Sequence, residues 1–389
     1  MKNIIYVYIK YFTAIVIFVF STDLKASVIC GDERTSEYFN LIKDKKIGIF
    51  TNHTGIAGDI HIVDLLVNNG FEVKFIFSPE HGFRGDADAG EKVDNYTDSN
   101  TEIPVYSLFN HKGGKPDVET MEKIDIIIVD IQDVGLRFYT YYITMYKLME
   151  ACSDSEKTML LLDRPNPNGF YVDGPVMDMK HKSGVGYLQI PVVHGMTLGE
   201  LALMINGEQW LTDGKHCDLQ VIKCKNYTHD TYYKLDVPPS PNLPNMRAIY
   251  LYPSICLFEG TKASLGRGTD FPFQVYGSPS MKGNFHFTPH SKQGAKKPQY
   301  MNQKCFGVDL RKIPCETIRK NGLDLKYIID AYKKMNIGEK FFTPFFEKLT
   351  GVDYIRRMII EGKSAAEIKS QWKDDVERFK ELRKKYLLY

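Results

Sequence analysis

Residues 125–163, "DIIIVDIQDVGLRFYTYYITMYKLMEACSDSEKTMLLLD", decide the fold. The stretch opens with an apolar run at 125–131, passes through a helical pattern at 140–153 and returns to an apolar run at 158–163. Both runs are rich in aliphatic residues without strict alternation, as is typical of strands that are covered on both faces. This strand–helix–strand unit predicts a parallel sheet with helices on either side.

The same rhythm continues on both sides of this unit. Strands are expected at 46–52, 72–78, 103–108 and 218–224, and helices at 61–70, 117–124 and 197–207. We therefore predict a doubly wound α/β domain over residues 27–289. From about residue 290 the sequence becomes lysine-rich, and a strand at 305–310 with helices at 322–335 and 364–386 predicts a smaller C-terminal α+β domain over 290–389.

The first 26 residues have the pattern of a signal peptide. Lys2 and Lys10 precede the apolar run at 11–20, and "LKA" at 24–26 places a small residue at the cleavage position. We expect an exported protein, in the periplasm, with no stable membrane insertion after cleavage. A lipoprotein anchored through Cys30 is the alternative, but Ile29 is not the small residue that such an anchor needs.

Composition excludes several classes of protein. The 389 residues carry a net charge of only +2 and no basic patch, so nucleic acid is not an expected partner. No GxSxG, HExxH or GxxxxGK[ST] motif occurs, and the GxG pairs at 184–186 and 266–268 lack a third glycine, so no cofactor is expected. The seven cysteines have no zinc-ligand spacing, and any pairing, such as Cys217 with Cys224 or Cys305 with Cys315, stays open.

Polar residues follow four of the expected strands. The tails are Thr51-Asn52-His53, Ser78-Pro79-Glu80-His81, Gln132-Asp133 after 125–131, and Arg164-Pro165-Asn166 after 158–163. Because ligands of open parallel sheets bind beyond the carboxyl ends of the strands, these tails predict the wall of a polar pocket.

Three carboxylates are candidates for catalysis. Glu80 follows a strand and lies between Phe77 and Phe83, apolar neighbours that could tune its pKa for a general acid. Asp133 could supply a base or nucleophile, and Glu259, beside a glycine-rich loop, is held in reserve. The structural alternatives are a surface carboxylate for Glu80 and a cap for a helix starting near Arg137 for Asp133.

Several donors could hold an anionic, sugar-like ligand. Arginines present rigid forked donors, and a tyrosine adds an aromatic face. A lone arginine is more often an ion-pair partner, and the role of the histidine is open. These binding candidates are Arg137, Tyr139, Arg164, Asn166 and His194.

Taken together, the motifs resemble the exo-β-N-acetylmuramidase family. They are "SPEHGFRG", "VDIQDVGLRFYTYY", "LDRPNPNG", "VHGMTLGELA", "PSPNLPN", "FEGTKASLGRGTDFPF" and the terminal "YLLY", in order over about residues 28–389. The resemblance implies a Rossmann-like domain without a nucleotide, joined to a C-terminal auxiliary domain across a cleft. It also implies release of N-acetylmuramic acid from the non-reducing end of peptidoglycan fragments, in cell-wall recycling. Muramyl saccharides are then the expected partners.

The resemblance also assigns residues. The family glutamate falls on Glu80, with His81 and Arg84 beside it, and a second motif carries over to Gln132, Asp133, Arg137 and Tyr139. Where the family often has asparagine in its EGTN motif, this chain has Lys262, which puts the fine specificity in question.

The implied substrate explains why the pocket should contain arginines. Glycoside hydrolysis generally uses two carboxyl groups, here Glu80 with Asp133 or Glu259. The lactyl carboxylate of the sugar could be gripped by Arg137, Arg164 or Arg267. An endo-acting peptidoglycan hydrolase and a non-catalytic wall-sugar binding protein are the alternatives.

Overall fold

The structure is a computed structural model that describes residues 26–79, 82–83, 94–108 and 114–389. The expected signal peptide, except for Ala26, lies outside the described residues, and so do Glu80, His81 and Arg84.

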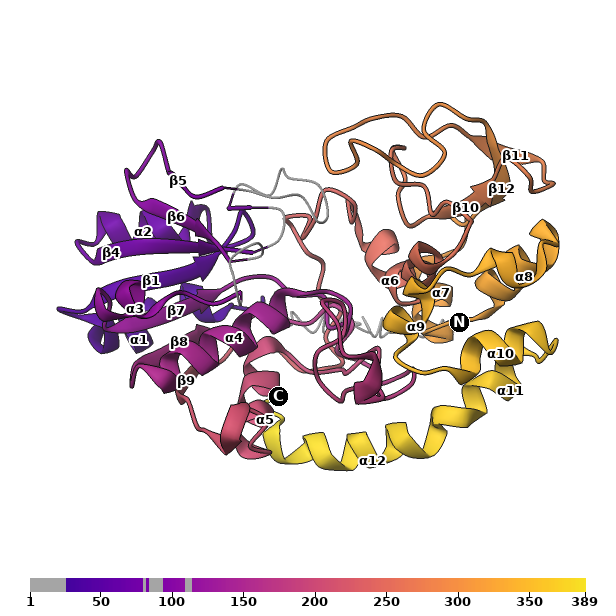
Figure 1. The fold of residues 1–389 in the computed structure, drawn as a ribbon. Helices are drawn as coiled ribbons and strands as arrows, with labels where there is room; N and C mark the ends of the chain where they lie inside the picture. Colours follow the sequence, from indigo (N-terminus) through magenta and orange to yellow (C-terminus); the bar gives the residue numbers. More distant parts are fainter. Residues whose placement is uncertain (1–25, 80–81, 84–93, 109–113) are drawn as a thin grey trace, which may run out of the picture.

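A seven-stranded sheet organises the N-terminal part of the chain (Figure 1), in the order β5-β6-β4-β1-β7-β8-β9. β1 lies in the middle, and the chain moves outward through β4 and β6 before crossing to the other side of β1 for β7, β8 and β9. These six strands are parallel, and only β5 runs antiparallel to its neighbour. The predicted doubly wound sheet is therefore confirmed. The strands are β1 Lys46–Thr51, β4 Glu72–Ser78, β5 Tyr96–Thr97, β6 Pro104–Ser107, β7 Ile126–Asp130, β8 Thr158–Leu162 and β9 Asp218–Ile222, with a hairpin of β2 Ile56–Ala57 and β3 Ile60–His61.

Helices bury the sheet on both faces. Along β7, Ile126 and Ile128 pack in one core with α1 and α2, whereas Ile127 and Val129 pack in a second core with α4 and α5. This alternation explains the continuous apolar runs, because each strand has a covered face on both sides. The helices are α1 Thr35–Ile42, α2 Ile62–Asn68, α3 Val118–Glu122, α4 Tyr141–Asp154 and α5 Leu198–Gly207.

The C-terminal part is built on a small antiparallel sheet, consistent with the predicted α+β class. β12 Cys305–Asp309 lies between β10 Val275–Ser278 and β11 Phe285–Phe287. The boundary predicted at 289/290 thus falls inside this sheet. The helices are α6 Met246–Ile255, α7 Cys315–Asn321, α8 Lys326–Met335, α9 Phe345–Thr350, α10 Tyr354–Ile360, α11 Ala365–Lys369 and α12 Lys373–Arg383. A 3-10 turn at Ser370–Trp372 interrupts the single helix expected at 364–386.

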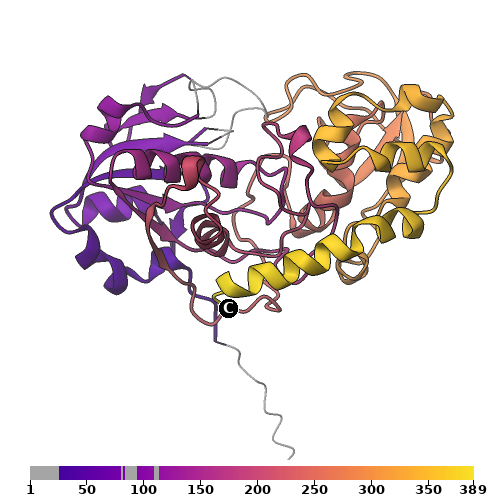
Figure 2. The same cartoon turned by 60° about the horizontal axis from the view of Figure 1, so that its bottom comes forward.

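α12 returns the chain from the C-terminal part to the sheet domain, where the C-terminus lies beside α5 (Figures 1 and 2). The last residues dock on buried acids: the Tyr389 hydroxyl donates to Asp163 Oδ2 at 2.8 Å, and the Leu388 N–H donates to Glu200 Oε1 at 2.8 Å. Hydrophobic side chains of both parts form one core, which holds the two parts in a fixed relation. Among the described residues, no helix has the length and apolarity needed to cross a membrane.

Candidate active site

The carboxyl ends of β1 and β7 mark the place where the sheet reverses its winding. β1 pairs with β4 on one side and with β7 on the other, so the loops after β1 and β7 diverge there. In open α/β sheets this divergence creates the crevice in which ligands bind. Asn52 and Gln132, two of the predicted site residues, begin these loops.

Asn52 and Gln132 form a hydrogen-bonded floor under the crevice. Asn52 Oδ1 accepts from the N–H and the hydroxyl of Thr54 at 2.9 and 2.6 Å, and Thr54 Oγ1 accepts from the Gln132 N–H at 3.0 Å. The Gln132 side-chain amide donates to the Pro165 carbonyl at 2.8 Å. All four residues lie in the buried floor, which makes the loops after three strands rigid relative to one another.

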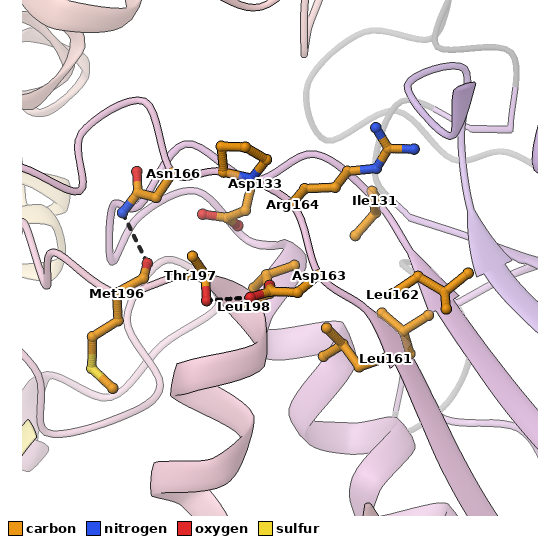
Figure 3. Close-up of a pocket in the computed structure, with 12 residues that line it drawn as sticks. Ile131, Asp133, Leu161, Leu162, Asp163, Arg164, Asn166, Met196, Thr197 and Leu198 are labelled. Atoms are coloured by element: carbon orange, nitrogen blue, oxygen red, sulfur yellow. Dashed lines mark hydrogen bonds between the residues drawn. The ribbon is translucent and has the colours of Figure 1, made fainter. Parts of the chain in front are cut away.

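Asp133 lies deeper, in a small cavity near the start of α5 (Figure 3). Its Oδ1 accepts from the Gly135 N–H at 2.6 Å, and its Oδ2 has no hydrogen-bond partner among the described residues. Burial raises the pKa of this carboxyl to about 7. Asp133 is not a helix cap, because α4 begins only at Tyr141, with Thr140 as its N-cap.

Arg164 and Arg137 have their guanidinium groups occupied by other parts of the protein. Arg164 donates from Nε to Asp130 at 2.6 Å and also pairs with Asp32, and Figure 3 shows its side chain extending away from Asp133. Arg137 is fully buried, and its two terminal nitrogens donate to four backbone carbonyls at 2.7–3.0 Å, those of Pro175, Ile190, Leu349 and Thr350. Arg137 therefore joins the sheet domain to the C-terminal end of α9, and these contacts leave it no reach towards a ligand.

A cleft lies between the sheet domain and the C-terminal part, next to the crevice. The segment before α4 contributes Tyr139, whose hydroxyl donates to the Pro239 carbonyl at 2.8 Å. The opposite wall contains Glu259, on the 3-10 helix η4 Cys256–Gly260, and Arg267 from the glycine-rich loop. The other lining residues are Phe138, Thr140, Tyr141, Val185, Ser240, Asn242, Leu243, Tyr252 and Phe273.

Glu259 and Arg267 form the charged pair of this cleft. Arg267 donates to Glu259 Oε1 from Nη2 at 2.6 Å and from Nε at 3.2 Å. Its guanidinium carbon lies 5.0 Å from the ring centre of Phe273, close enough for a cation–π contact. The side chains are 24% and 26% exposed for Arg267 and Glu259, so both can reach a ligand.

The cleft continues towards the strand that precedes Glu80. The Tyr141 hydroxyl, at the cleft wall, accepts a hydrogen bond from Asn52 Nδ2 at 3.0 Å. β1 and β4 pair with Phe50 opposite Phe77, and two further residues along each chain bring Asn52 level with Pro79. Pro79 is the last described residue before Glu80 in the chain. The structure thus brings Asn52 and Tyr139 together with Glu259 and Arg267 along one edge of the sheet domain.

Asn166 and His194 lie in the interior rather than in this cleft. The Asn166 side chain donates to the Met196 carbonyl and accepts from the Asn168 N–H, each at 2.8 Å. His194 is 1% exposed, and burial, with Arg383 beside it, lowers its pKa to about 3. Val193, the residue before His194, makes only isolated bridges, with Leu136 and Asp173.

The sequence reasoning did not single out Tyr141, Asn242, Tyr252 and Phe273 as site residues. Three of them lie within the sequence motifs quoted above: Tyr141 in "RFYTYY", Asn242 in "PSPNLPN" and Phe273 at the end of the glycine-rich loop. A concentration of aromatic residues beside the predicted polar tails was the available signal, because sugar rings pack on aromatic faces. Tyr252 carried no such signal, since it lies in α6, a helix that was not predicted.

One group among the described residues has donor atoms spaced for a cation: Cys30, Asp32 and Glu33 lie within 4.8 Å of one another. Asp32 is paired with Arg164, and Glu33 accepts the Cys30 N–H at 2.7 Å. These donors are thus already engaged within the protein.

Comparison with known proteins places the chain in a family. Residues 47–247 match the model of the N-terminal part of exo-beta-N-acetylmuramidase NamZ, and residues 250–389 match the model of its C-terminal part. The peptidoglycan beta-N-acetylmuramidase NamZ of Bacillus subtilis is 37% identical over 92% of this chain and 90% of its own length.

Two solved structures from Bacteroides fragilis, both DUF1343 family proteins, have the same fold. One is 60% identical with a TM-score of 0.88 and covers 94% of this chain and 99% of its own. The other is 28% identical with a TM-score of 0.79 and covers 93% of this chain and 99% of its own. On these matches, the chain belongs to the NamZ family of exo-β-N-acetylmuramidases.

Proposed function

We propose that this glycoside hydrolase acts on peptidoglycan fragments and releases N-acetylmuramic acid from their non-reducing end. The proposal is supported by the family and by the activity named for the Bacillus subtilis relative. The observation that carries it is the Glu259–Arg267 pair, whose side chains are partly exposed in a cleft with aromatic walls. This cleft lies next to the end of the strand that precedes Glu80 in the chain. A saccharide that bears a carboxylate needs an aromatic face and an accessible cation of this kind.

Arg267 is our candidate for binding the lactyl carboxylate. Of the three arginines considered, Arg137 and Arg164 are 0% and 8% exposed and donate to protein acceptors. Arg267 uses Nε and Nη2 for Glu259, and its Nη1 has no hydrogen-bond partner among the described residues. A guanidinium held on one edge by a glutamate and open on the other can receive a second carboxylate.

We propose that Glu80 is the general acid that protonates the leaving oxygen. Glu259 is our first candidate for the second carboxylate, because it is accessible from the cleft. Asp133 is the alternative, but it lines a separate small cavity and is only 7% exposed. We also propose that residues 1–26 direct export to the periplasm, where peptidoglycan is found.

The test compares a chromogenic β-N-acetylmuramide with the matching β-N-acetylglucosaminide. We expect release from the muramide and far less from the glucosaminide. Saccharides ending in N-acetylmuramic acid or N-acetylglucosamine at the non-reducing end distinguish the mode of action, because an exo enzyme shortens only the former. Internal cleavage of both would indicate an endo-acting hydrolase. Binding without release, by folded protein, would indicate a non-catalytic wall-sugar binding protein.

A further inference from the structure

Cys30 and Cys224, 194 positions apart in the sequence, meet at the edge of the sheet domain. Both side chains are buried, with exposures of 4% and 6%. Their neighbours Ile29 and Lys225 form an antiparallel bridge, in which each N–H donates to the other carbonyl at 3.0 and 2.8 Å. The two cysteines are therefore directly opposite each other on adjacent antiparallel segments.

The backbone around the cysteines has the geometry of a non-hydrogen-bonded pair. The Cys30 N–H donates to Glu33 Oε2 at 2.7 Å and the Cys224 N–H donates to the Tyr389 hydroxyl at 2.8 Å, so neither points at the opposite cysteine. Opposite residues of such a pair have Cα atoms about 4.5 Å apart and side chains on the same face. Disulfides accept Cα separations of about 4.4–6.8 Å, so the cysteines could be joined without moving the backbone.

The two thiols also interact with each other. The neighbouring Cys224 thiol lowers the pKa of the Cys30 thiol, and the contact with Cys30, together with burial, raises the pKa of the Cys224 thiol, whose Sγ donates to the Asp163 carbonyl at 3.2 Å. Such an arrangement favours Cys30 as the thiolate and Cys224 as the thiol. Because the thiolate is the nucleophile in disulfide exchange, the pair is arranged with an attacking and a resolving cysteine.

We propose that Cys30 and Cys224 form a disulfide that fastens the N-terminal segment to the end of β9. The oxidant is a disulfide-bearing thiol oxidant of the exported compartment. Cys30 attacks one of its sulfurs, forms a mixed disulfide and expels a thiolate. Cys224 then loses its proton, attacks the Cys30 sulfur and releases the reduced dithiol, so the two electrons pass from the two cysteines to the oxidant. The inference rests on the proposed export and not on the proposed reaction.

Other fates of these cysteines fit the structure less well. A lipid anchor on Cys30 would place an acyl chain in the buried contact with Cys224, and Cys30 Sγ also lies 3.5 Å from the Tyr233 hydroxyl. A link between Cys217 and Cys224 is ruled out by geometry, because the two lie at opposite ends of β9, about 20 Å apart. Cys152 also contacts Cys217, but no backbone pairing holds that second pair in register.

The test begins with the full-length chain, expressed with its own leader in a host with an oxidising periplasm. Acid precipitation first stops thiol exchange, free thiols are then blocked with N-ethylmaleimide in denaturant near neutral pH, and the protein is digested without reductant for mass spectrometry. We expect a peptide that links Cys30 to Cys224. Reduction should lower the Tm by about 5 °C or more, because the bond closes a loop of nearly 200 residues. Cys30→Ser should remove that sensitivity, whereas Cys256→Ser, a buried control in the C-terminal part, should keep it.

A second measurement separates geometry from export. Protein without residues 1–26 is refolded in a redox buffer of reduced and oxidised glutathione, and the Cys30–Cys224 disulfide should form there as well. Maleimide on both cysteines in the exported and in the refolded protein would overturn the proposal. So would a diacylglyceryl thioether on Cys30. If Cys30→Ser does not fold, the linked peptide of the unaltered chain still decides the question.

Discussion

Arg137→Met should destabilise the protein strongly while leaving substrate affinity nearly unchanged. The guanidinium is 0% exposed and donates four hydrogen bonds of 2.7–3.0 Å to carbonyls in three separate segments of the chain. Methionine has a similar length but no donor, so four carbonyls would lose their partner at about 1–3 kcal/mol each. Relief from burying a charge offsets part of this loss, since burial already lowers the pKa of Arg137 to about 10. A net loss of about 3–5 kcal/mol in the free energy of unfolding follows.

Urea unfolding followed by fluorescence measures this loss directly. Arg137→Lys should fall between the two, because an ammonium offers three donors without the planar fork. KM for a chromogenic muramide, measured at a temperature where the variants remain folded, should change less than about threefold. A variant with normal stability and a KM raised tenfold or more would refute this reasoning and return Arg137 to the ligand-binding role predicted from the sequence.

Two further variants test the cleft and the buried acid. Arg267→Met should raise KM for muramides by about 10- to 100-fold, the value of a charged hydrogen bond, and should raise KM for glucosaminides less. The matched control is Arg311→Met, which removes an ion pair with Asp309 outside the cleft. Equal losses on both substrates would contradict a contact between Arg267 and the lactyl group. Asp133→Asn should remove a pH dependence of stability, because the pKa of about 7 in the folded protein lies above the unfolded value. Between pH 5 and pH 8 the free energy of unfolding of the unaltered protein should fall by up to about 2–3 kcal/mol, whereas that of the variant should not. Parallel pH profiles of the two proteins in urea unfolding would contradict the raised pKa.

Sequence reasoning anticipated the sheet because strand signals there are local. Every strand from β1 to β9 except the two-residue β2, β3 and β5 was expected within about two residues of its observed bounds. The C-terminal part was less predictable for physical reasons. α6 contains Pro253 in its interior and β10 contains Gly277, features that weaken helix and strand signals, whereas β12 was expected at 305–310.

The site was predictable in kind but not in detail. Among the described residues, the tails after β1, β7 and β8 do meet at the carboxyl edge of the sheet, as strand geometry requires. The sequence could not show that Arg137 is bound by the carbonyl of Leu349, 212 residues away, or Arg164 by Asp32, 132 residues away. Arginines that bind ligands and arginines that satisfy buried carbonyls look alike until the fold brings their partners together.

The most direct test of the account is the turnover of Glu80→Gln on the chromogenic β-N-acetylmuramide. Glutamine keeps the size of the side chain but cannot donate the proton, so kcat should fall by about 10²- to 10⁴-fold with an unchanged Tm. Glu72→Gln, at the exposed start of the same strand β4, is the matched control and should keep full activity. A Glu80→Gln enzyme with kcat within a few-fold of the unaltered protein would contradict the central claim that Glu80 is the general acid.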